Sequence, residues 1–276
     1  MTSGPAERYL RTAQAMRDGL APRPALRLTM EGLLLLAAAA QRPVRPEELT
    51  ERARTQLGIL QGHGLIGNGG TPTEQAAPVT RALTVPNVRL NADIGTSKGR
   101  ATWSAWLGAE RAVVAVKVDP ASDDLAVFVV PPAWAPVMAI RWLGVGPRPE
   151  AAPGSVALIP LALLQQRLAN PATPAPAGAC AEVRTLWDQA LVLWGLKAEP
   201  GGFGVLVLDA GRAGLWQASI RGDAAAVTPP GGSKSVPPGD VLLSSLPAHG
   251  IWRHVTRCVV AADTLRRRTP RQPEPR

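Results

Sequence analysis

The stretch Val88–Leu107, VRLNADIGTSKGRATWSAWL, decides the fold because apolar and polar residues alternate on both sides of a glycine-containing turn. Apolar side chains occupy every second position from Val88 to Ile94, and they alternate again after the turn. A period of two is typical of half-buried β-strands, and Gly95–Gly99 supplies the turn residues. The stretch therefore predicts a β-hairpin.

The sequence on either side of this hairpin predicts an α+β fold. Two Val-rich runs, Glu110–Val118 and Asp124–Val130, follow the hairpin and extend it to a four-stranded meander. Helical patterns precede it at Leu33–Ala40 and from Pro46 onward. A similar order of helix, strands and helix recurs in the second half. We therefore expect a central mixed, largely antiparallel sheet flanked by helices, in two quasi-symmetric halves.

The second half contains the clearest helical spacing in the chain. Val183–Trp194 places apolar residues at intervals of three and four, which predicts a single helix. Phe203–Leu208 and Leu215–Ile220 predict two strands joined by a tight turn. The C-terminal region is expected to be helical, first over Asp240–Leu246 and then over Ile251–Leu265.

The composition is that of a folded protein and leaves little for metal chemistry. The 276 residues are 46% hydrophobic and 18% charged, with two cysteines and three histidines. So few cysteines exclude a disulfide scaffold and an ordinary thiolate zinc site. The longest apolar run, Leu33–Ala40, is too short to cross a bilayer, and the first twenty residues contain no signal-peptide pattern. We expect a cytoplasmic protein without cofactors and without membrane insertion.

The formal net charge of +9 is partly concentrated in the arginine-rich residues 266–276. A basic tail is able to hold nucleic acid, but no aromatic residue is interleaved with these arginines to stack on bases. We expect 266–276 to be a disordered basic tail with no nucleic-acid partner. Residues 1–25 are then an N-terminal extension, and 26–265 is the folded domain, with halves at about 26–150 and 151–265.

No motif in the sequence indicates catalysis. Gly62–Gly67, GHGLIG, matches G-x-G-x-x-G, but a predicted helix precedes it and further glycines follow. A dinucleotide site needs a strand before this motif and a helix after it. The chain also lacks the G-x-x-x-x-G-K-[ST], H-E-x-x-H and G-x-S-x-G patterns. We expect no enzymatic activity and assign no catalytic, cofactor-binding or metal-binding residue.

Two tryptophans of the hairpin suggest a contact surface. Trp103 and Trp106 have odd spacing on one strand, so their side chains leave opposite faces of the sheet. Tryptophan is enriched in the hot spots of protein interfaces. Either one of these side chains reaches a protein-contact surface beside Thr102 and Ser104, or helices cover both faces and bury both rings.

The order and spacing of several phrases resemble the EspG family of type VII (ESX) secretion-associated proteins of actinobacteria. The resemblance covers roughly residues 26–262. Its phrases are LTME at Leu28–Glu31, PEEL at Pro46–Leu49, the Gly64-Leu65 helix end, GSVALIP at Gly154–Pro160, GFGV at Gly202–Val205, the Asp209–Arg212 hairpin, and PGD at Pro238–Asp240.

The resemblance implies an EspG-like α+β fold and a cytosolic, non-enzymatic chaperone. Such chaperones bind the apolar tip of a helical PE–PPE substrate pair and keep it soluble for export. Where PE–PPE proteins are few, the expected substrate is instead a helical protein of the WXG100 type. The resemblance also implies partner contact at the first hairpin turn and at the C-terminal helices. The expected partner-binding residues are Ile94, Gly95, Thr96, Ser97, Lys98, Gly99, Arg100, Trp103, Trp252, Arg253 and Arg257.

Two other function classes stay open at the level of sequence. The Pro46–Ile66 stretch and the positive charge suit a DNA-binding transcriptional regulator with a winged-helix-like N-terminal half. A recognition helix should be basic, however, and Leu49–Leu60 mixes Glu51 with Arg52 and Arg54. An uncatalogued enzyme is the second alternative, and no motif argues for it.

Overall fold

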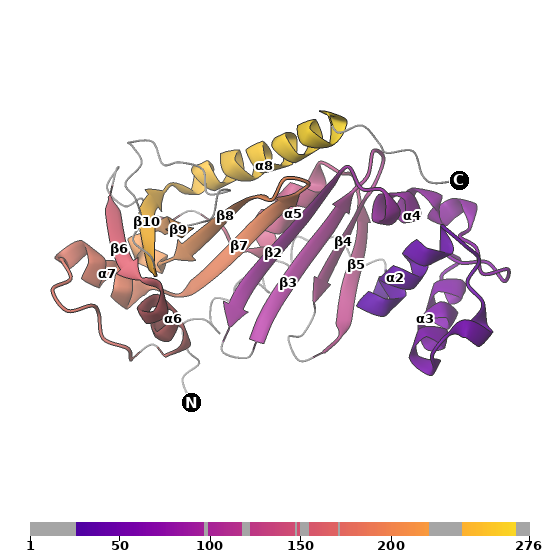
Figure 1. Cartoon of the computed structure of the whole chain (residues 1–276), viewed down its shortest axis with the longest axis horizontal. Helices are drawn as coiled ribbons and strands as arrows, with labels where there is room; N and C mark the ends of the chain where they lie inside the picture. The colour runs from indigo at the N-terminus through magenta and orange to yellow at the C-terminus, as the bar shows by residue number, and fades with distance from the viewer. Residues whose placement is uncertain are drawn as a thin grey trace.

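The computed structural model describes residues 26–96, 99–117, 122–146, 148–149, 155–170, 172–220 and 239–268. Its centre is a ten-stranded sheet in the order β1-β5-β4-β3-β2-β7-β8-β9-β10-β6 (Figure 1). All of its ladders are antiparallel. The strands are β1 (Leu26–Thr29), β2 (Val88–Thr96), β3 (Gly99–Leu107), β4 (Ala112–Lys117), β5 (Asp124–Val130), β6 (Val156–Pro160), β7 (Val192–Glu199), β8 (Phe203–Asp209), β9 (Leu215–Ile220) and β10 (Asp240–Leu246).

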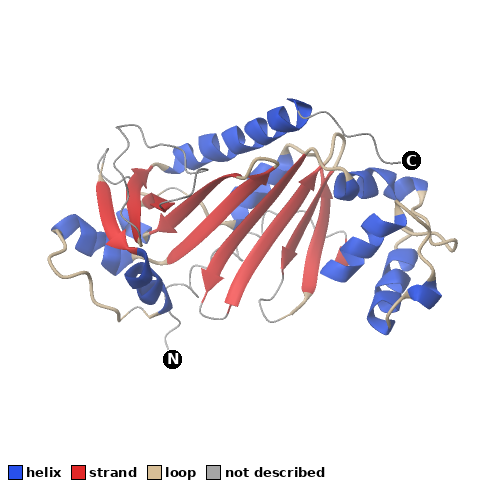
Figure 2. Ribbon diagram, viewed as in Figure 1, coloured by secondary structure: helices blue, strands red, loops and turns tan. Residues whose placement is uncertain are grey.

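Helices connect these strands and pack on both faces of the sheet (Figure 2). The α-helices are α2 (Met30–Ala39), α3 (Glu51–Gly62), α4 (Ala77–Thr84), α5 (Trp134–Trp142), α6 (Leu161–Ala169), α7 (Ala181–Gln189) and α8 (Ala248–Arg268). Short 3-10 helices occur at Pro46–Glu48, Glu74–Ala76 and Gly211–Ala213.

The sheet consists of two halves with the same internal order. From its outer edge inward the first half runs β1-β5-β4-β3-β2, and the second runs β6-β10-β9-β8-β7. The halves join where β2 pairs with β7, from Arg89↔Glu199 to Ile94↔Trp194. The predicted α+β fold with quasi-symmetric halves is therefore confirmed, and within the described ranges the sheet is entirely antiparallel rather than mixed.

Three clusters of buried side chains hold the sheet and helices together. The largest lies between the middle of the sheet and the helices α5 and α8, and it contains Trp103 and Trp194. On the opposite face, one cluster joins α2, α3 and α4 to the first half, and another joins α6 and α7 to the second. In the view of Figures 1 and 2, α2–α4 and α6–α7 lie at the two ends of the sheet, α5 lies behind it and α8 runs along its upper side. The side of β2, β3 and β7 that faces the viewer is not covered by these helices.

The predicted hairpin is present and longer than expected. β2 and β3 pair continuously from Val88↔Leu107 to Thr96↔Gly99, so the ladder includes most of the predicted turn. The remaining turn residues, Ser97 and Lys98, lie outside the described residues.

The predicted helix over Val183–Trp194 is wrong in its second half. α7 ends at Gln189, and Val192 begins β7. The apolar spacing fits both structures, because Leu186 and Trp187 pack in the cluster under α6 and α7 while Trp194 is buried in the central cluster. A short apolar run fits a helix or a strand by periodicity alone.

The C-terminal prediction needs two further corrections. Asp240–Leu246 is β10 rather than a helix, because it pairs between β6 and β9 and its alternate residues Val241 and Leu243 enter the core. α8 continues to Arg268, so the first three residues of the predicted tail are helical. Asp263 pairs with Arg267 at 2.8 Å and Arg266 at 3.6 Å in this last turn.

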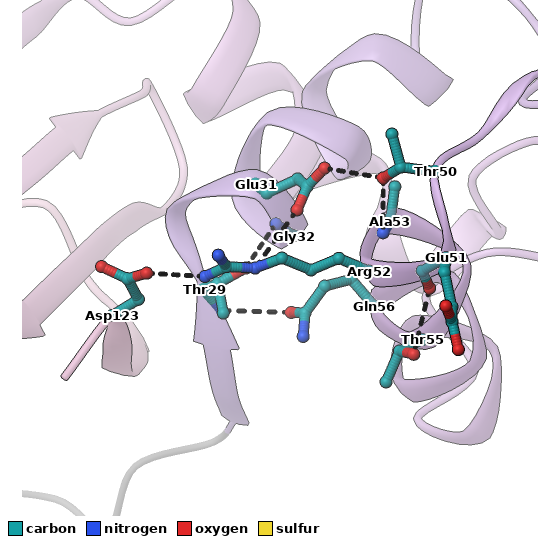
Figure 3. Close-up of polar contacts among 10 residues, drawn as sticks. All are labelled: Thr29, Glu31, Gly32, Thr50, Glu51, Arg52, Ala53, Thr55, Gln56 and Asp123. Carbon is teal, nitrogen blue, oxygen red and sulfur yellow. Dashed lines mark hydrogen bonds and ion pairs between the residues drawn. The ribbon is translucent and has the colours of Figure 1, made fainter.

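Side-chain caps and ion pairs fix the N-terminal helices. The Thr29 hydroxyl accepts from the Gly32 N–H at the start of α2, and the Thr50 hydroxyl accepts from Ala53 at the start of α3. Arg52 reaches from α3 to Asp123 at 2.7 Å and to Glu31 at 3.5 Å (Figure 3). The hydrogen bond from Arg52 lowers the pKa of Asp123. This pairing ties α3 to α2 and to the start of β5.

Candidate partner-binding surface

The outer face of α8 carries a row of exposed residues spaced four apart, Trp252, Thr256, Val260 and Thr264. Trp252 is 40% exposed and Val260 is 59% exposed. Each threonine hydroxyl donates to the carbonyl four residues earlier, at 2.9 Å for Thr256 and 2.7 Å for Thr264. Because both hydroxyls are satisfied within the helix, the row needs no polar group from a partner. We name this row the α8 ridge.

Two arginines lie beside the α8 ridge, one helical turn apart. Arg253 and Arg257 are both exposed. Among the described residues, no carboxylate forms an ion pair with either guanidinium. Free guanidinium groups bind carboxylates through paired hydrogen bonds. The surface therefore combines two exposed apolar side chains, and two threonines whose hydroxyls are satisfied, with adjacent arginines that have no carboxylate partner within the described ranges. A row at spacing four is the shape that packs into the groove of another helix.

The inner face of α8 anchors this surface to the sheet. α8 packs across β7, β8 and β2. The His254 Nε2 atom lies 3.3 Å from the Gly204 carbonyl oxygen of β8, and burial lowers the pKa of His254. The apolar anchors, which are all buried, are Ile251, Val255, Cys258 and Ala262.

The two cysteines are expected to differ sharply in reactivity. Burial raises the pKa of Cys258 to about 11, whereas Cys180 is exposed at the start of α7. Because the thiolate is the reactive form, Cys180 should react rapidly with a thiol reagent at pH 8 and Cys258 only after unfolding. Timed labelling with a disulfide reagent, with and without denaturant, measures both. Rapid labelling of a Cys180→Ser variant in the native state would contradict the packing of α8.

The hairpin residues of the predicted site divide into buried and undescribed side chains. Ile94 and Trp103 are each 1% exposed in the central cluster beneath α5 and α8. The expectation that these two contact a partner is corrected, because α8 and α5 cover that face of the sheet. Gly95, Thr96, Gly99 and Arg100 belong to the β2–β3 ladder, and Ser97 and Lys98 lie outside the described residues.

Of the two tryptophans, Trp106 is the one that leaves the central core. It is half-buried on the opposite face, and the Arg89 guanidinium lies 6.0 Å from its ring centroid. The Ser104 hydroxyl donates to the Asn91 side-chain oxygen at 3.0 Å on the same face. The uncovered middle of the sheet is therefore polar. Alternation in the sequence predicts that the two tryptophans face opposite sides of the sheet. It does not predict the contact between Arg89 and the Trp106 ring, because that contact depends on the strand register that places Arg89 opposite Trp106.

The hairpin turn and the α8 ridge are far apart. Figure 1 shows the end of β2 and the start of β3, which pair at Thr96↔Gly99, on the lower side of the sheet and α8 along its upper side. Trp252, Arg253 and Arg257 lie in the first half of α8, which begins directly after β10. In the strand order, β7, β8 and β9 lie between β10 and β2. The structure thus brings Trp252, Arg253 and Arg257 together and separates them from the hairpin turn.

The described residues contain no cluster of three or more His, Cys, Asp or Glu side chains arranged to hold a metal ion. Every helix within the described ranges is too short or too polar to pass through a bilayer. A hollow of about 380 Å³ lies at the β7–β8 turn, lined by Arg89, Lys197 and Glu199 among others. Arg89 and Lys197 are exposed and Glu199 is partly exposed, so the hollow is part of the protein surface rather than a closed site.

Comparison with solved structures finds chains of similar fold. The Mycobacterium tuberculosis type VII secretion system chaperone EspG5, solved in complex with a PE25–PPE41 dimer, matches with a TM-score of 0.51 and 14% identity. The alignment covers 86% of this chain and 96% of the other. The fold is EspG-like. No family model matches the sequence, and no curated protein matches it.

Proposed function

We propose that this chain is a cytoplasmic, non-enzymatic chaperone of type VII secretion. It binds the apolar tip of a helical secreted protein, of the PE–PPE or WXG100 type, and keeps that protein soluble until export. Its partner is a protein, rather than nucleic acid or a membrane. The EspG-like fold over 86% of the chain carries this proposal, because the similar chaperone was solved with a PE–PPE dimer bound.

The α8 ridge is the surface that suits such a substrate. Its apolar row is matched to the ridges and grooves of a helix, and Arg253 and Arg257 lie where acidic groups at the rim of a helical tip would be bound. The uncovered middle of the sheet suits an apolar tip less well, since Arg89, Asn91 and Ser104 line it. We therefore assign the apolar contact to α8 and keep the hairpin turn as a second, polar contact.

The alternative of a winged-helix regulator has less support. The strands after α4 are central strands of a ten-stranded sheet rather than a two-stranded wing. In α3, the helix that would enter DNA, Arg52 is paired with Asp123 and Glu31 instead of free for phosphates (Figure 3).

Co-expression tests the proposed function directly. The full chain is expressed with a PE–PPE pair, and separately with a WXG100 pair, each from the genome that encodes it. We expect one of the pairs to form a stoichiometric complex on gel filtration and to stay soluble only when the chain is present. Failure to bind either pair would overturn the proposal. A purified chain that instead shifts duplex DNA at physiological salt would favour the regulator.

The hairpin turn gives a separate prediction. Lys98→Glu combined with Arg100→Glu should abolish capture of the substrate, because the reversed charges repel the polar rim that the turn is proposed to hold. The matched control is Arg111→Glu with Arg212→Glu, two exposed positions that give the same change in net charge. A pull-down and a thermal melt of both double variants decide the question. Wild-type capture by the hairpin variant at unchanged stability would exclude the turn from the interface.

A further inference from the structure

The two edges of the ten-stranded sheet, β1 and β6, are treated differently by the rest of the chain. At β1 the Thr29 N–H points away from the sheet and donates to the Gln56 Oε1 atom of α3 at 3.0 Å (Figure 3). Arg27 lies two residues before Thr29, so its backbone also faces outward, and its exposed side chain places a charge on this edge. A covering side chain and a charge are two common ways in which proteins prevent an edge strand from pairing.

β6 ends the strand order at the other edge, and its outward groups have no partner among the described residues. The Ser245 N–H donates to the Ser155 carbonyl at 3.1 Å, and the Leu161 N–H donates to the Gly239 carbonyl at 2.9 Å. These bonds fix which residues of β6 face β10, because the pattern alternates along an antiparallel ladder. Val156, Leu158 and Pro160 therefore direct their backbone groups outward.

The side chains of this edge offer no protection either. Val156 is 51% exposed and Leu158 is 49% exposed. From Ser155 to Pro160 the strand has no charged residue, although the whole chain carries +9. Leu242 of β10 is paired with Leu158 and extends the apolar surface inward. An uncharged, apolar strand edge of this kind readily adds another strand.

The strand is also complementary to itself. If two copies pair antiparallel about Ala157, Val156 of each copy lies opposite Leu158 of the other. Every outward N–H group of both strands then has a carbonyl acceptor, and Pro160, which has no N–H, falls beyond the paired stretch. The exposed Val156 and Leu158 side chains of the two copies cover one another. The absence of charge on β6 lets two basic chains meet there without like charges directly opposed.

We propose that β6 is a homodimer interface, through which two copies of this chain join their sheets edge to edge about Ala157. The pairing is isologous, so it closes at two copies. One short strand buries less surface than a standard protein interface, and the dimer is therefore in rapid exchange with monomer. This inference does not depend on the proposed function.

Sedimentation velocity of the full chain over a wide concentration range tests the interface. We expect the wild type to shift from monomer to dimer as concentration rises, and Leu158→Lys to stay monomeric, because the new charge lies on the paired edge. The matched control is Leu34→Lys, an exposed leucine on α2 that should leave the dimer intact. Thermal melts of both variants should match the wild type. A dimer that survives Leu158→Lys would overturn the proposal.

A disulfide trap tests the register. In the proposed pairing the two Ala157 residues form a non-hydrogen-bonded pair with Cα atoms about 4.5 Å apart, within the range that a disulfide spans. Ala157→Cys in a Cys180→Ser background should therefore form a covalent dimer on mild oxidation, and Leu34→Cys in the same background should not. A wild type that stays monomeric with no trapped dimer overturns the proposal. A cysteine at 157 that cross-links only to a co-expressed substrate would instead assign the edge to that substrate.

Discussion

Replacing Trp252 by alanine is expected to weaken capture of the helical substrate by roughly thirtyfold, or about 2 kcal/mol. Trp252 begins the α8 ridge, and it is 40% exposed next to the exposed Arg253. A tryptophan at the centre of an interface typically contributes this much, because its whole ring is desolvated on binding. Isothermal titration with the purified substrate pair measures the change.

The control for this prediction uses the same residue type. Trp134 on α5 is 48% exposed and lies outside the α8 ridge, so Trp134→Ala should leave the affinity unchanged. Val260→Asp, on the ridge, should cause a loss comparable to that of Trp252→Ala. Both ridge variants should retain the wild-type melting temperature, since exposed positions contribute little to stability. Wild-type affinity in both ridge variants would place the substrate elsewhere on the chain.

Replacing Trp103 by alanine is expected to lower the free energy of unfolding by about 3–5 kcal/mol. Trp103 is 1% exposed and packs in the central cluster beneath α5 and α8, so its removal leaves a large cavity. Its indole N–H has no hydrogen-bond partner among the described residues. Trp103→Phe should therefore cost far less, about 1.5 kcal/mol, because it loses volume but no hydrogen bond.

Urea unfolding followed by circular dichroism separates these outcomes. Trp252→Ala serves as the control, with an expected change of at most about 0.5 kcal/mol. If Trp103→Ala kept wild-type stability but lost substrate capture, Trp103 would belong to the interface, as the sequence first suggested. A large loss of stability with capture retained at low temperature would confirm its place in the core.

The first hairpin could be predicted from the sequence because its alternation is long and uninterrupted. The end of α7 could not. Arg167, on α6, donates to the Trp187 carbonyl at 2.9 Å and to the Asp188 carbonyl at 3.1 Å, which caps the last turn of α7. This cap comes from a residue distant in sequence, so local spacing gives no sign that the helix stops before Trp194.

The candidate site could be predicted only as far as local spacing and alternation determine it. The spacing of four that places Trp252 and Val260 on one row is visible in the sequence, although the family resemblance points only to Trp252, Arg253 and Arg257 on this helix. Alternation also required Trp103 and Trp106 to face opposite sides. Which ring is buried depends on where α5 and α8 pack, and that is a property of the tertiary fold. The separation of the hairpin turn from α8 likewise requires the strand order.

The nested strand order also determines how the chain folds as it is synthesised. In each half the first strand pairs with the last, as in Leu26↔Val127 and Val156↔Ser244. The local hairpins can form early, whereas these outer strands close long loops and join late. The first half can be completed once β5 has left the ribosome, but the inner edge of β2 has no partner until β7 arrives. About 70 residues separate the end of β5 from the end of β7. At a synthesis rate of 5–20 residues per second, the inner edge of β2 therefore stays unpaired for roughly 4–14 s. The centre of the finished sheet is thus the part of the nascent chain most exposed to mispairing.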